Sequence, residues 1–266
     1  MNRINREKGW RSLGILTWNT RISLGLTEQT WSWVLEHIAP LHVILFQEVK
    51  DPNRVRNILG DDWFVWPFLN YRTNGCVVAL KVRRFTVIDK VLRDNKHGSK
   101  HLRHIVALEV HDRRTERPML FGSLHVDPLG AGFLKANRLA RGRHIRQVDS
   151  WCRYIAAYLG LGLHHQAAFV GGDVNEDMKQ EYRVKQEQPR LAGSTVLALM
   201  AGIYMKPAFK ERPNTGVKFD DVFHGGRGIK VVGRRSIKIP EHIHGGEHMD
   251  HELVHVEYMV RRGEDL

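Results

Sequence analysis

The sequence predicts an α/β (α+β) fold in which β-sheets pack face to face and helices cover the outside. Short apolar runs rich in β-branched residues recur along the chain, and turns of Gly, Pro, Asn or charged residues bound them. Such runs are typical of strands, and few segments show helical spacing. No repeat or linker interrupts the 266 residues, so we expect one domain over residues 1–266.

The strands are predicted from the apolar runs themselves. Each run is brief and ends at a turn-forming residue, which favours a strand over a helix. The expected strands cover residues 12–18, 42–46, 75–81, 85–92, 104–110, 119–126, 167–172, 217–223 and 252–260.

Three helices are expected between these strands. Thr27 is a good N-cap, and the helix after it should end before Pro40. The apolar stripe of this helix consists of Trp31, Val34, Leu35 and Ile38. A longer helix is expected over residues 136–159, and a third should begin at Ser194. The apolar face of the longer helix consists of Ile145, Val148, Cys152, Ile155 and Leu159.

Composition limits the classes of function. The chain has 41 Lys and Arg against 29 Asp and Glu, a net charge of +12, with 16 His. This excess favours a polyanionic partner such as nucleic acid, a phosphorylated small molecule or an anionic membrane surface, with solubility as the plain alternative. The two cysteines exclude a disulfide framework, and no apolar run approaches the ~18 residues of a membrane span. We expect a cytoplasmic monomer with no membrane partner.

Polar side chains interrupt the pattern where the predicted strands end or begin. These residues are Asn19, Glu48, His125, Asp173, Asn175, Asp220, Asp221, Asp250 and His251. Carboxylate and amide oxygens without thiolates suit a hard cation, Mg²⁺ or Mn²⁺. A cation with few protein ligands keeps positions for a phosphate oxygen and for water. A carboxylate can then orient or deprotonate that water while histidines stabilise charge, and together these groups predict a phosphoester hydrolase.

The same segments resemble a known family. The motifs TWN, FQEVK, GSLHVD, GGDVN, FDDVF and MDHELV occur in this order between Leu13 and Val260. Together they resemble the endonuclease/exonuclease/phosphatase superfamily, which includes deoxyribonucleases, apurinic endonucleases and tyrosyl-DNA phosphodiesterases. The resemblance implies a four-layer α/β/β/α sandwich of two packed mixed sheets, and a phosphodiesterase that uses Mg²⁺ or Mn²⁺ and metal-activated water.

The resemblance also implies roles for single residues. Glu48 is similar to the principal metal ligand of the family, with support from Asn19 and Asp250. Asp173 matches the carboxylate that positions or activates the water and also stands with the metal ligands, and Asn175 matches its companion at the phosphate.

The remaining catalytic positions are histidines and their partner. His251 matches the histidine at the scissile phosphate, Asp220 matches the residue that orients it, and His125 resembles the second histidine of deoxyribonuclease-type members. Asp221 stands where the family commonly has an aromatic residue, so either Asp220 or Asp221 could pair with His251. Met249 replaces the usual Ser before the final Asp-His pair.

Two other motifs compete for these residues. The alternation of Asp173, Asn175 and Asp177 resembles the start of an EF-hand loop, but Met178 and Val184 occupy the positions that need Gly and Glu. The HELVH segment at residues 251–255 matches the zinc-metalloprotease motif, which works only on a helix. The β-branched residues that follow favour a strand, so the protease is the least favoured alternative.

The basic residues are candidates for contact with a nucleic-acid backbone, although a solvated face is the usual role of any single charge. The candidates are Arg72, Arg83, Arg84, Arg138, Arg141, Arg143, Arg146, Arg234 and Arg235. The favoured function is a nuclease or DNA-processing phosphodiesterase with nucleic acid, foremost DNA, as substrate. The alternatives are a phosphatase of inositol polyphosphates or other small phosphorylated substrates, and a catalytically dead nucleic-acid-binding protein.

Overall fold

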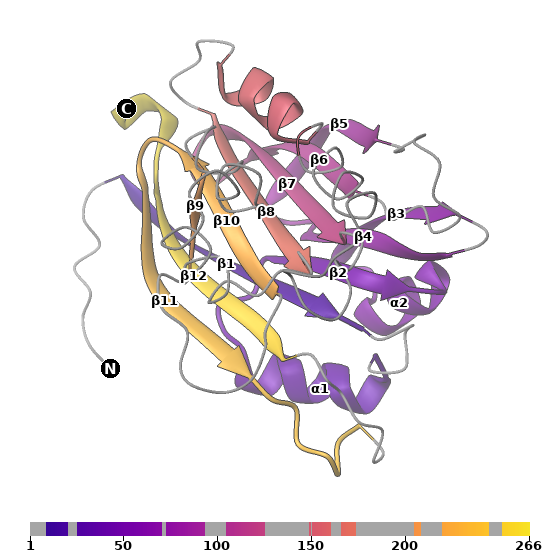
Figure 1. The fold of residues 1–266 in the computed structure, drawn as a ribbon. Coiled ribbons are helices and arrows are strands. Elements are labelled where there is room, and N and C mark those ends of the chain that lie inside the picture. The colour runs from indigo at the N-terminus through magenta and orange to yellow at the C-terminus, as the bar shows by residue number, and fades with distance from the viewer. Residues whose placement is uncertain are drawn as a thin grey trace, which may run out of the picture.

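A computed structural model shows two six-stranded sheets packed face to face (Figure 1). It describes residues 9–20, 26–70, 73–93, 105–125, 149, 151–160, 166–173, 205–208, 220–244 and 252–266. Each sheet combines parallel and antiparallel pairs, so both are mixed. The expected sandwich of two packed mixed sheets is therefore confirmed.

The first sheet contains the N-terminal and C-terminal strands. In spatial order its strands are β11 (Ile229–Ile237), β12 (Leu253–Arg261), β1 (Trp10–Asn19), β2 (Val43–Val49), β4 (Thr73–Lys81) and β3 (Trp63–Asn70). Only β1 and β2 run parallel to each other, so their carboxyl ends lie at the same edge of this sheet.

The second sheet holds the middle of the chain. In spatial order its strands are β5 (Phe85–Arg93), β6 (Ile105–Asp112), β7 (Arg117–His125), β8 (Ala167–Asp173), β10 (Asp220–Gly226) and β9 (Lys206–Pro207). Strands β7 and β8 are parallel, whereas β10 runs antiparallel to β8. The end of β7, the end of β8 and the start of β10 therefore meet.

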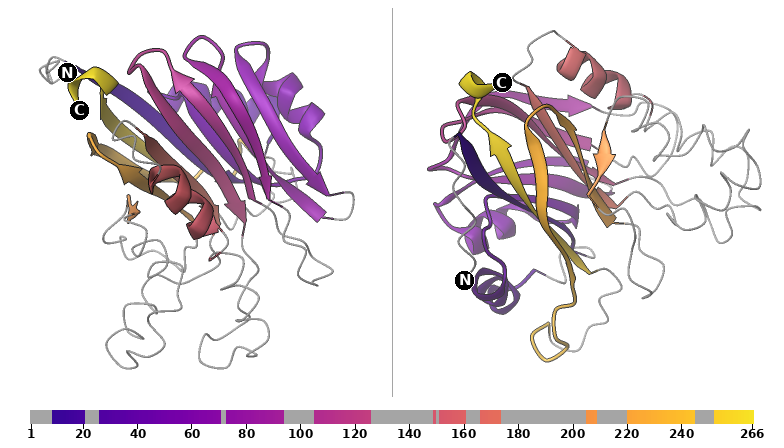
Figure 2. Two further views of the ribbon diagram at one scale, coloured as in Figure 1. Left: turned by 90° about the horizontal axis from the view of Figure 1, so that it is seen from above. Right: turned by 90° about the vertical axis from the view of Figure 1, so that its left-hand side faces the viewer.

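Helices cover the outer faces of both sheets. Helix α1 (Glu28–His37) and helix α2 (Pro52–Leu59) pack on the first sheet. Helical residues 151–160 pack on the second sheet, so the right panel of Figure 2 shows four layers. Among the described residues, no helix is long and apolar enough to cross a membrane.

The apolar core forms three layers between these elements. The largest cluster lies between the sheets and includes Leu45, Phe121, Phe169 and Tyr258. Burial of such side chains removes apolar surface from water and provides the main driving force for packing the sheets.

Helix α1 begins as predicted, but one position of its stripe is wrong. The Thr27 hydroxyl accepts a hydrogen bond from the Thr30 backbone N–H at 3.1 Å and caps the helix. Trp31 and Val34 are buried, whereas Leu35 is 49% exposed. Leu35 lies beyond the edge of the narrow face that contacts the sheet.

Some helices and strands of the structure were not predicted from the sequence. Helix α2, capped by Asp51, was not predicted, nor were strands β3, β9 and β11. The expected helix from Ser194 and most of the one over 136–159 lie outside the described residues.

The described part of the HELVH segment, residues 252–255, does not form a helix. Leu253 begins strand β12, and His255 lies within that strand, paired with Leu16 of β1. The zinc-protease alternative is therefore wrong, because the spacing of that motif brings its histidines together only on a helix.

Candidate active site

Three predicted site residues from both sheets meet at the strand ends. His125 is the last residue of β7, and its Nε2 lies 3.6 Å from Oε1 of Glu48 and 3.5 Å from Oδ2 of Asp173. Glu48 belongs to β2 of the first sheet, and Asp173 ends β8 of the second. We call Glu48, His125 and Asp173 the catalytic cluster, after the roles that the family resemblance implies for them.

Asn19 joins this cluster from the end of β1. Its Nδ2 donates a hydrogen bond of 3.3 Å to Oδ2 of Asp173, across the two sheets. Asn19 is 1% exposed and Asp173 is 2% exposed, so the interaction is shielded from solvent. Asn19 thus holds the carboxylate that the sequence assigns to the attacking water.

Asp220 also lies at this edge. It is the first residue of β10 and stands directly opposite Asp173 in the antiparallel register. Asp220 is 4% exposed, and the neighbouring Asp221 is fully buried. Oδ1 of Asp221 accepts a hydrogen bond from the Val222 backbone N–H at 2.7 Å.

The negative charge of Asp221 acts on Tyr258 in the interior of the sandwich. Burial raises the pKa of Tyr258 well above its usual value, and the negative charge of Asp221 raises it further. Tyr258 belongs to the cluster between the sheets. The choice between Asp220 and Asp221 as the partner of His251 stays a prediction, because His251 lies outside the described residues.

The backbone of β2 is distorted where it carries Glu48. Its pairing with β4 shifts register between Phe46 and Val49, which marks a bulge. Glu48 has a φ of 56°, in the left-handed region that non-glycine residues rarely adopt. Bulges re-aim side chains, and such strained residues concentrate at functional sites. The distortion supports a functional role for Glu48.

The two glycines before Asp173 let the sheets approach each other. A Cβ on Gly171 would come within 2.8 Å of Leu45 Cδ1 on the facing sheet. A Cβ on Gly172 would lie 1.9 Å from the Leu124 carbonyl oxygen, and the φ of Gly172 is 150°. Gly172 therefore has to be glycine, whereas a Cβ on Gly171 would require the Leu45 side chain to move.

A network of buried hydrogen bonds next to the cluster connects the two sheets. Gln47 Nε2 donates to Ser123 Oγ at 3.0 Å, and Ser123 Oγ donates to the Phe46 carbonyl at 2.7 Å. Thr17 Oγ1 lies 3.2 Å from Oε1 of Gln47. Sequence reasoning did not assign roles to these residues, although Gln47 and Ser123 stand inside the FQEVK and GSLHVD motifs.

Several predicted residues lie outside the described part of the chain. These are Arg72, Arg138, Arg141, Arg143, Arg146, Asn175, Asp250 and His251. Their proposed roles stay predictions. Within the described residues, no group of three or more His, Cys, Asp or Glu side chains is arranged to hold a metal ion.

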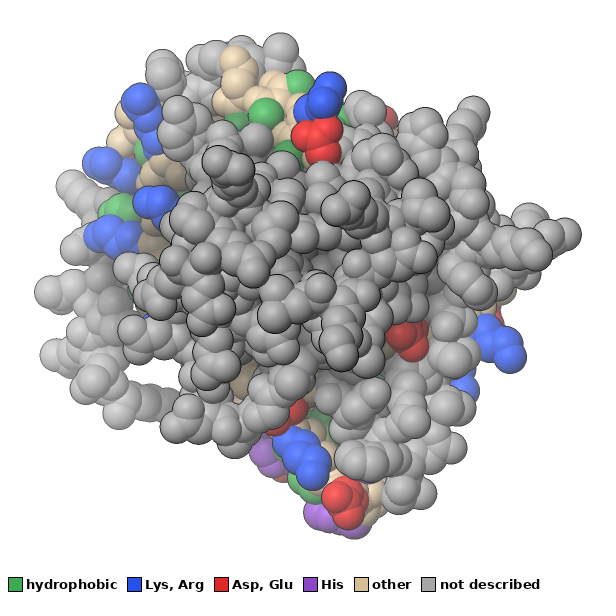
Figure 3. All heavy atoms as spheres, viewed as in Figure 1, with side chains coloured by type: hydrophobic (Ala, Val, Ile, Leu, Met, Phe, Trp, Pro, Cys, Tyr) green, Lys and Arg blue, Asp and Glu red, His purple; other side chains and the backbone are tan. Residues whose placement is uncertain are grey.

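Among the basic candidates, Arg84 is not a phosphate contact. It is 3% exposed, and its guanidinium donates two hydrogen bonds to Asp112, at 2.9 Å and 2.8 Å. Figure 3 shows Lys and Arg side chains at the left of the view, on the side where β11 lies. On that strand Arg234 donates to the Ala208 carbonyl at 2.8 Å, and Arg235 lies 3.5 Å from Glu257.

Comparison with solved structures identifies the fold. No protein-family model matches the chain, and no curated protein matches it. An endonuclease/exonuclease/phosphatase family protein from Bacteroides thetaiotaomicron aligns over 94% of this chain and 98% of its own, with a TM-score of 0.65 and 14% identity. This is the endonuclease/exonuclease/phosphatase fold.

Other proteins with the endonuclease/exonuclease/phosphatase fold align equally fully. D. rerio TDP2, solved with a single-strand DNA product, covers 93% of this chain and 98% of its own, with a TM-score of 0.58 and 11% identity. ANGEL2, a 2′,3′-cyclic phosphatase solved with adenosine-2′,3′-vanadate, covers 94% and 98%, with a TM-score of 0.68 and 10% identity. At these identities the likeness establishes the fold.

Proposed function

We propose that the whole chain forms one catalytic domain, a divalent-metal-dependent phosphodiesterase that hydrolyses nucleic acid, foremost DNA. One observation carries the proposal. Glu48, His125 and Asp173 come from distant parts of the sequence, yet they meet within 3.6 Å at one edge of the sandwich. A buried imidazole beside two carboxylates is a constellation for proton transfer and phosphate chemistry.

The donor atoms at this edge are of the kinds that a divalent cation binds. Glu48 and Asn19 offer carboxylate and amide oxygens, which are the ligands that Mg²⁺ and Mn²⁺ prefer, and the described part of the edge contains no thiolate. Asp250 and Asp173 complete the proposed ligand set. When bound, the cation supplies positive charge that polarises a phosphate oxygen.

The chain's own residues supply the remaining chemistry. Asp173, held by Asn19, orients the attacking water and accepts its proton. His125 lies beside both carboxylates and can pass a proton to the leaving oxygen. We assign Asn175 and His251 to the phosphate itself and Asp220 to the orientation of His251.

Charge supports nucleic acid as the substrate. The net charge of +12 favours a polyanion, and the TDP2 neighbour was solved with single-strand DNA product. We predict that affinity for DNA falls steeply between 50 and 200 mM salt, on the order of ten-fold or more for a few phosphate contacts. Fluorescence anisotropy of a labelled oligonucleotide measures this, and a flat response contradicts a nucleic-acid substrate.

A second candidate is a phosphatase of small phosphorylated molecules, such as inositol polyphosphates. The ANGEL2 neighbour, a 2′,3′-cyclic phosphatase, favours it. A flat salt response together with release of inorganic phosphate from such a molecule would select this candidate over the nuclease.

One assay tests both candidates. The purified chain with Mg²⁺ is mixed with plasmid, abasic duplex, 5′-tyrosyl oligonucleotide or inositol polyphosphate, and each reaction is repeated with EDTA. We expect chelator-sensitive cleavage of at least one nucleic acid. DNA binding that survives EDTA, with no turnover on any substrate, would instead indicate a catalytically dead binding protein.

A further inference from the structure

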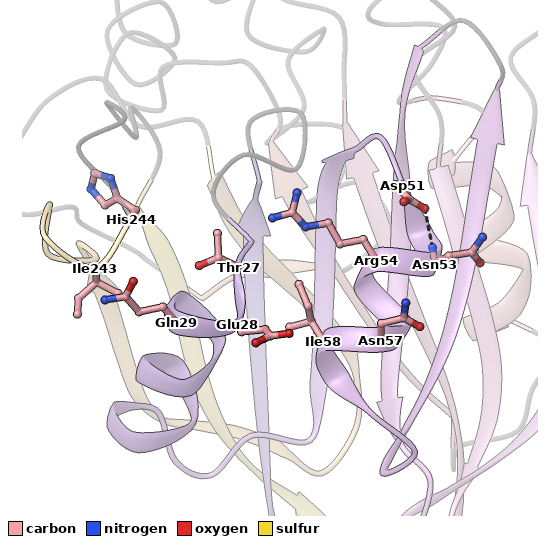
Figure 4. Close-up of a pocket in the computed structure, with 10 residues that line it drawn as sticks. All are labelled: Thr27, Glu28, Gln29, Asp51, Asn53, Arg54, Asn57, Ile58, Ile243 and His244. Atoms are coloured by element: carbon pink, nitrogen blue, oxygen red, sulfur yellow. Dashed lines mark hydrogen bonds between the residues drawn. The ribbon is translucent and has the colours of Figure 1, made fainter.

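A pocket of about 680 Å³ lies between the N-terminal ends of α1 and α2 (Figure 4). Its walls come from three chain segments, residues 27–29, 51–58 and 243–244. The first follows Asn19 along the chain, the second follows Glu48, and the third precedes Asp250. Asp51 follows Glu48 by only three residues, and this short connection is the basis for linking the pocket to a substrate whose phosphate lies at the cluster.

His244 on the wall of this pocket has an unused hydrogen-bonding capacity. It is 7% exposed, and within the described part of the chain neither of its ring nitrogens has a hydrogen-bond partner. A buried polar group without a partner is unfavourable. In Figure 4 His244 and Arg54 lie on opposite sides of the pocket. A ligand that offers both a donor and an acceptor would satisfy the imidazole.

The charges around the pocket argue against a dedicated phosphate site. The carboxylates of Glu28 and Asp51 offset the single guanidinium of Arg54. Oδ1 of Asp51 already accepts the Asn53 backbone N–H at 2.9 Å, as the cap of α2. An anion would meet two negative groups here, so an uncharged ligand fits better.

The remaining groups of the pocket suit a flat heterocycle. Gln29 and Asn57 are exposed amides, each with donors and an acceptor, and Ile58 and Ile243 supply apolar surface. Proteins recognise unpaired bases by stacking on apolar or imidazole surfaces and by hydrogen bonds from amides to the base edge.

We propose that this pocket, the base pocket, binds an unpaired nucleobase of the substrate whose scissile phosphate lies at the catalytic cluster. The inference rests on the proposed nucleic-acid hydrolysis for its biological meaning. Occupancy of the base pocket by a nucleoside, however, can be measured without turnover.

The binding test uses the imidazole signals of His244 in NMR spectra of the full chain, assigned by their loss in His244→Phe. The probes are adenosine, cytidine, ribose 5-phosphate, methyl glucoside and inorganic phosphate. We expect the His244 signals to shift with a nucleoside and to stay in place with the other probes. A shift with phosphate alone, a shift with the glucoside alone, or no shift at all would overturn the base pocket.

The activity test compares an oligonucleotide with one that carries abasic nucleotides beside the cleaved bond. In Gln29→Ala and His244→Phe, the ratio of kcat/KM for the first substrate over the second should fall about ten-fold. The matched control is His242→Phe, an exposed histidine of the same turn, which should keep the wild-type ratio. An unchanged ratio in both pocket variants contradicts the inference. Absence of hydrolysis in the wild-type chain contradicts the proposed function instead, and the NMR titration then decides the base pocket alone.

Discussion

The two ends of the second sheet hold buried charged side chains in different ways. Near the start of β7, Arg84 and Asp112 are joined by two hydrogen bonds, at 2.9 Å and 2.8 Å, and both side chains are buried. At the end of the same strand, His125 lies 3.6 Å from Glu48 and 3.5 Å from Asp173. A tight hydrogen bond between charged groups is shorter, at about 2.7–2.9 Å.

This difference distinguishes side chains that stabilise the fold from side chains that we assign to catalysis. The Arg84 and Asp112 pair is saturated, since Asp112 also accepts the Thr115 hydroxyl at 2.9 Å. Such a pair holds the fold and leaves no room for a ligand. The separations within the catalytic cluster are longer, at 3.6 Å and 3.5 Å, and we assign its oxygens and imidazole to the proposed chemistry.

The largest expected effect on turnover is at the end of the sheet that carries the catalytic cluster. Asp173→Asn keeps the shape of the side chain but removes the charge that accepts the proton of water, so kcat should fall about a thousand-fold or more. Thermal unfolding should change little. Steady-state hydrolysis of the best substrate from the panel, with circular dichroism on the same sample, measures both, and near-normal turnover by a folded variant contradicts the role of Asp173.

An Asp-to-Asn substitution in the Arg84 and Asp112 pair should lower stability and leave turnover unchanged. Asp112→Asn leaves the buried guanidinium of Arg84 without its counter-charge, which typically destabilises a protein by about 3–5 kcal/mol. Turnover per folded molecule should stay at the wild-type level. Urea unfolding gives the free energy, and a large loss of turnover with unchanged stability would reverse the comparison.

A smaller effect concerns a histidine that supports the fold. Burial lowers the pKa of His255 to about 4, with a further contribution from Arg235, and its Nε2 lies 2.9 Å from the Pro40 carbonyl oxygen. In the unfolded chain the imidazole has an ordinary pKa of about 6.5, so below that pH the unfolded state binds more protons.

Stability should therefore fall as pH drops from about 6.5 toward 4, by at most about 1.4 kcal/mol per pH unit from this residue. Unfolding in urea at pH 7, 6 and 5 measures the slope. His255→Gln should reduce this slope, to which His42 and His224 also contribute because burial lowers their pKa values too. An identical slope in the variant would exclude His255 as a source of the pH dependence.

Much of the architecture follows from local sequence, and the exceptions have physical reasons. The buried strands were predictable because a continuous apolar run, such as residues 167–170, indicates a buried strand from the local sequence alone. Strand β3 was missed because Pro67 interrupts it, and Pro is normally excluded from strands except at sheet edges, where β3 lies. Strand β11, at the opposite edge of the same sheet, is only half-buried and carries little apolar signal.

The candidate site was predictable to a similar extent. A carboxylate or amide directly after a buried run indicated Asn19, Glu48 and Asp173. The left-handed backbone of Glu48 could not be predicted, because it arises from a bulge against β4. The burial of Arg84 depends on the distant Asp112, so its sequence neighbourhood, with exposed Arg83 beside it, gave no signal.

Glu48 offers the most direct test, since the chain provides its own control. Among the described residues, Glu48 and Glu116 are the non-glycine residues with positive φ, at 56° and 53°. Glu116 lies in the turn before β7, away from the catalytic cluster. Hydrolysis by Glu48→Gln and Glu116→Gln should be measured with Mg²⁺ alongside the unfolding of each variant. We predict that both variants fold and that only Glu48→Gln loses turnover, whereas a folded Glu48→Gln with full activity would contradict the role of Glu48.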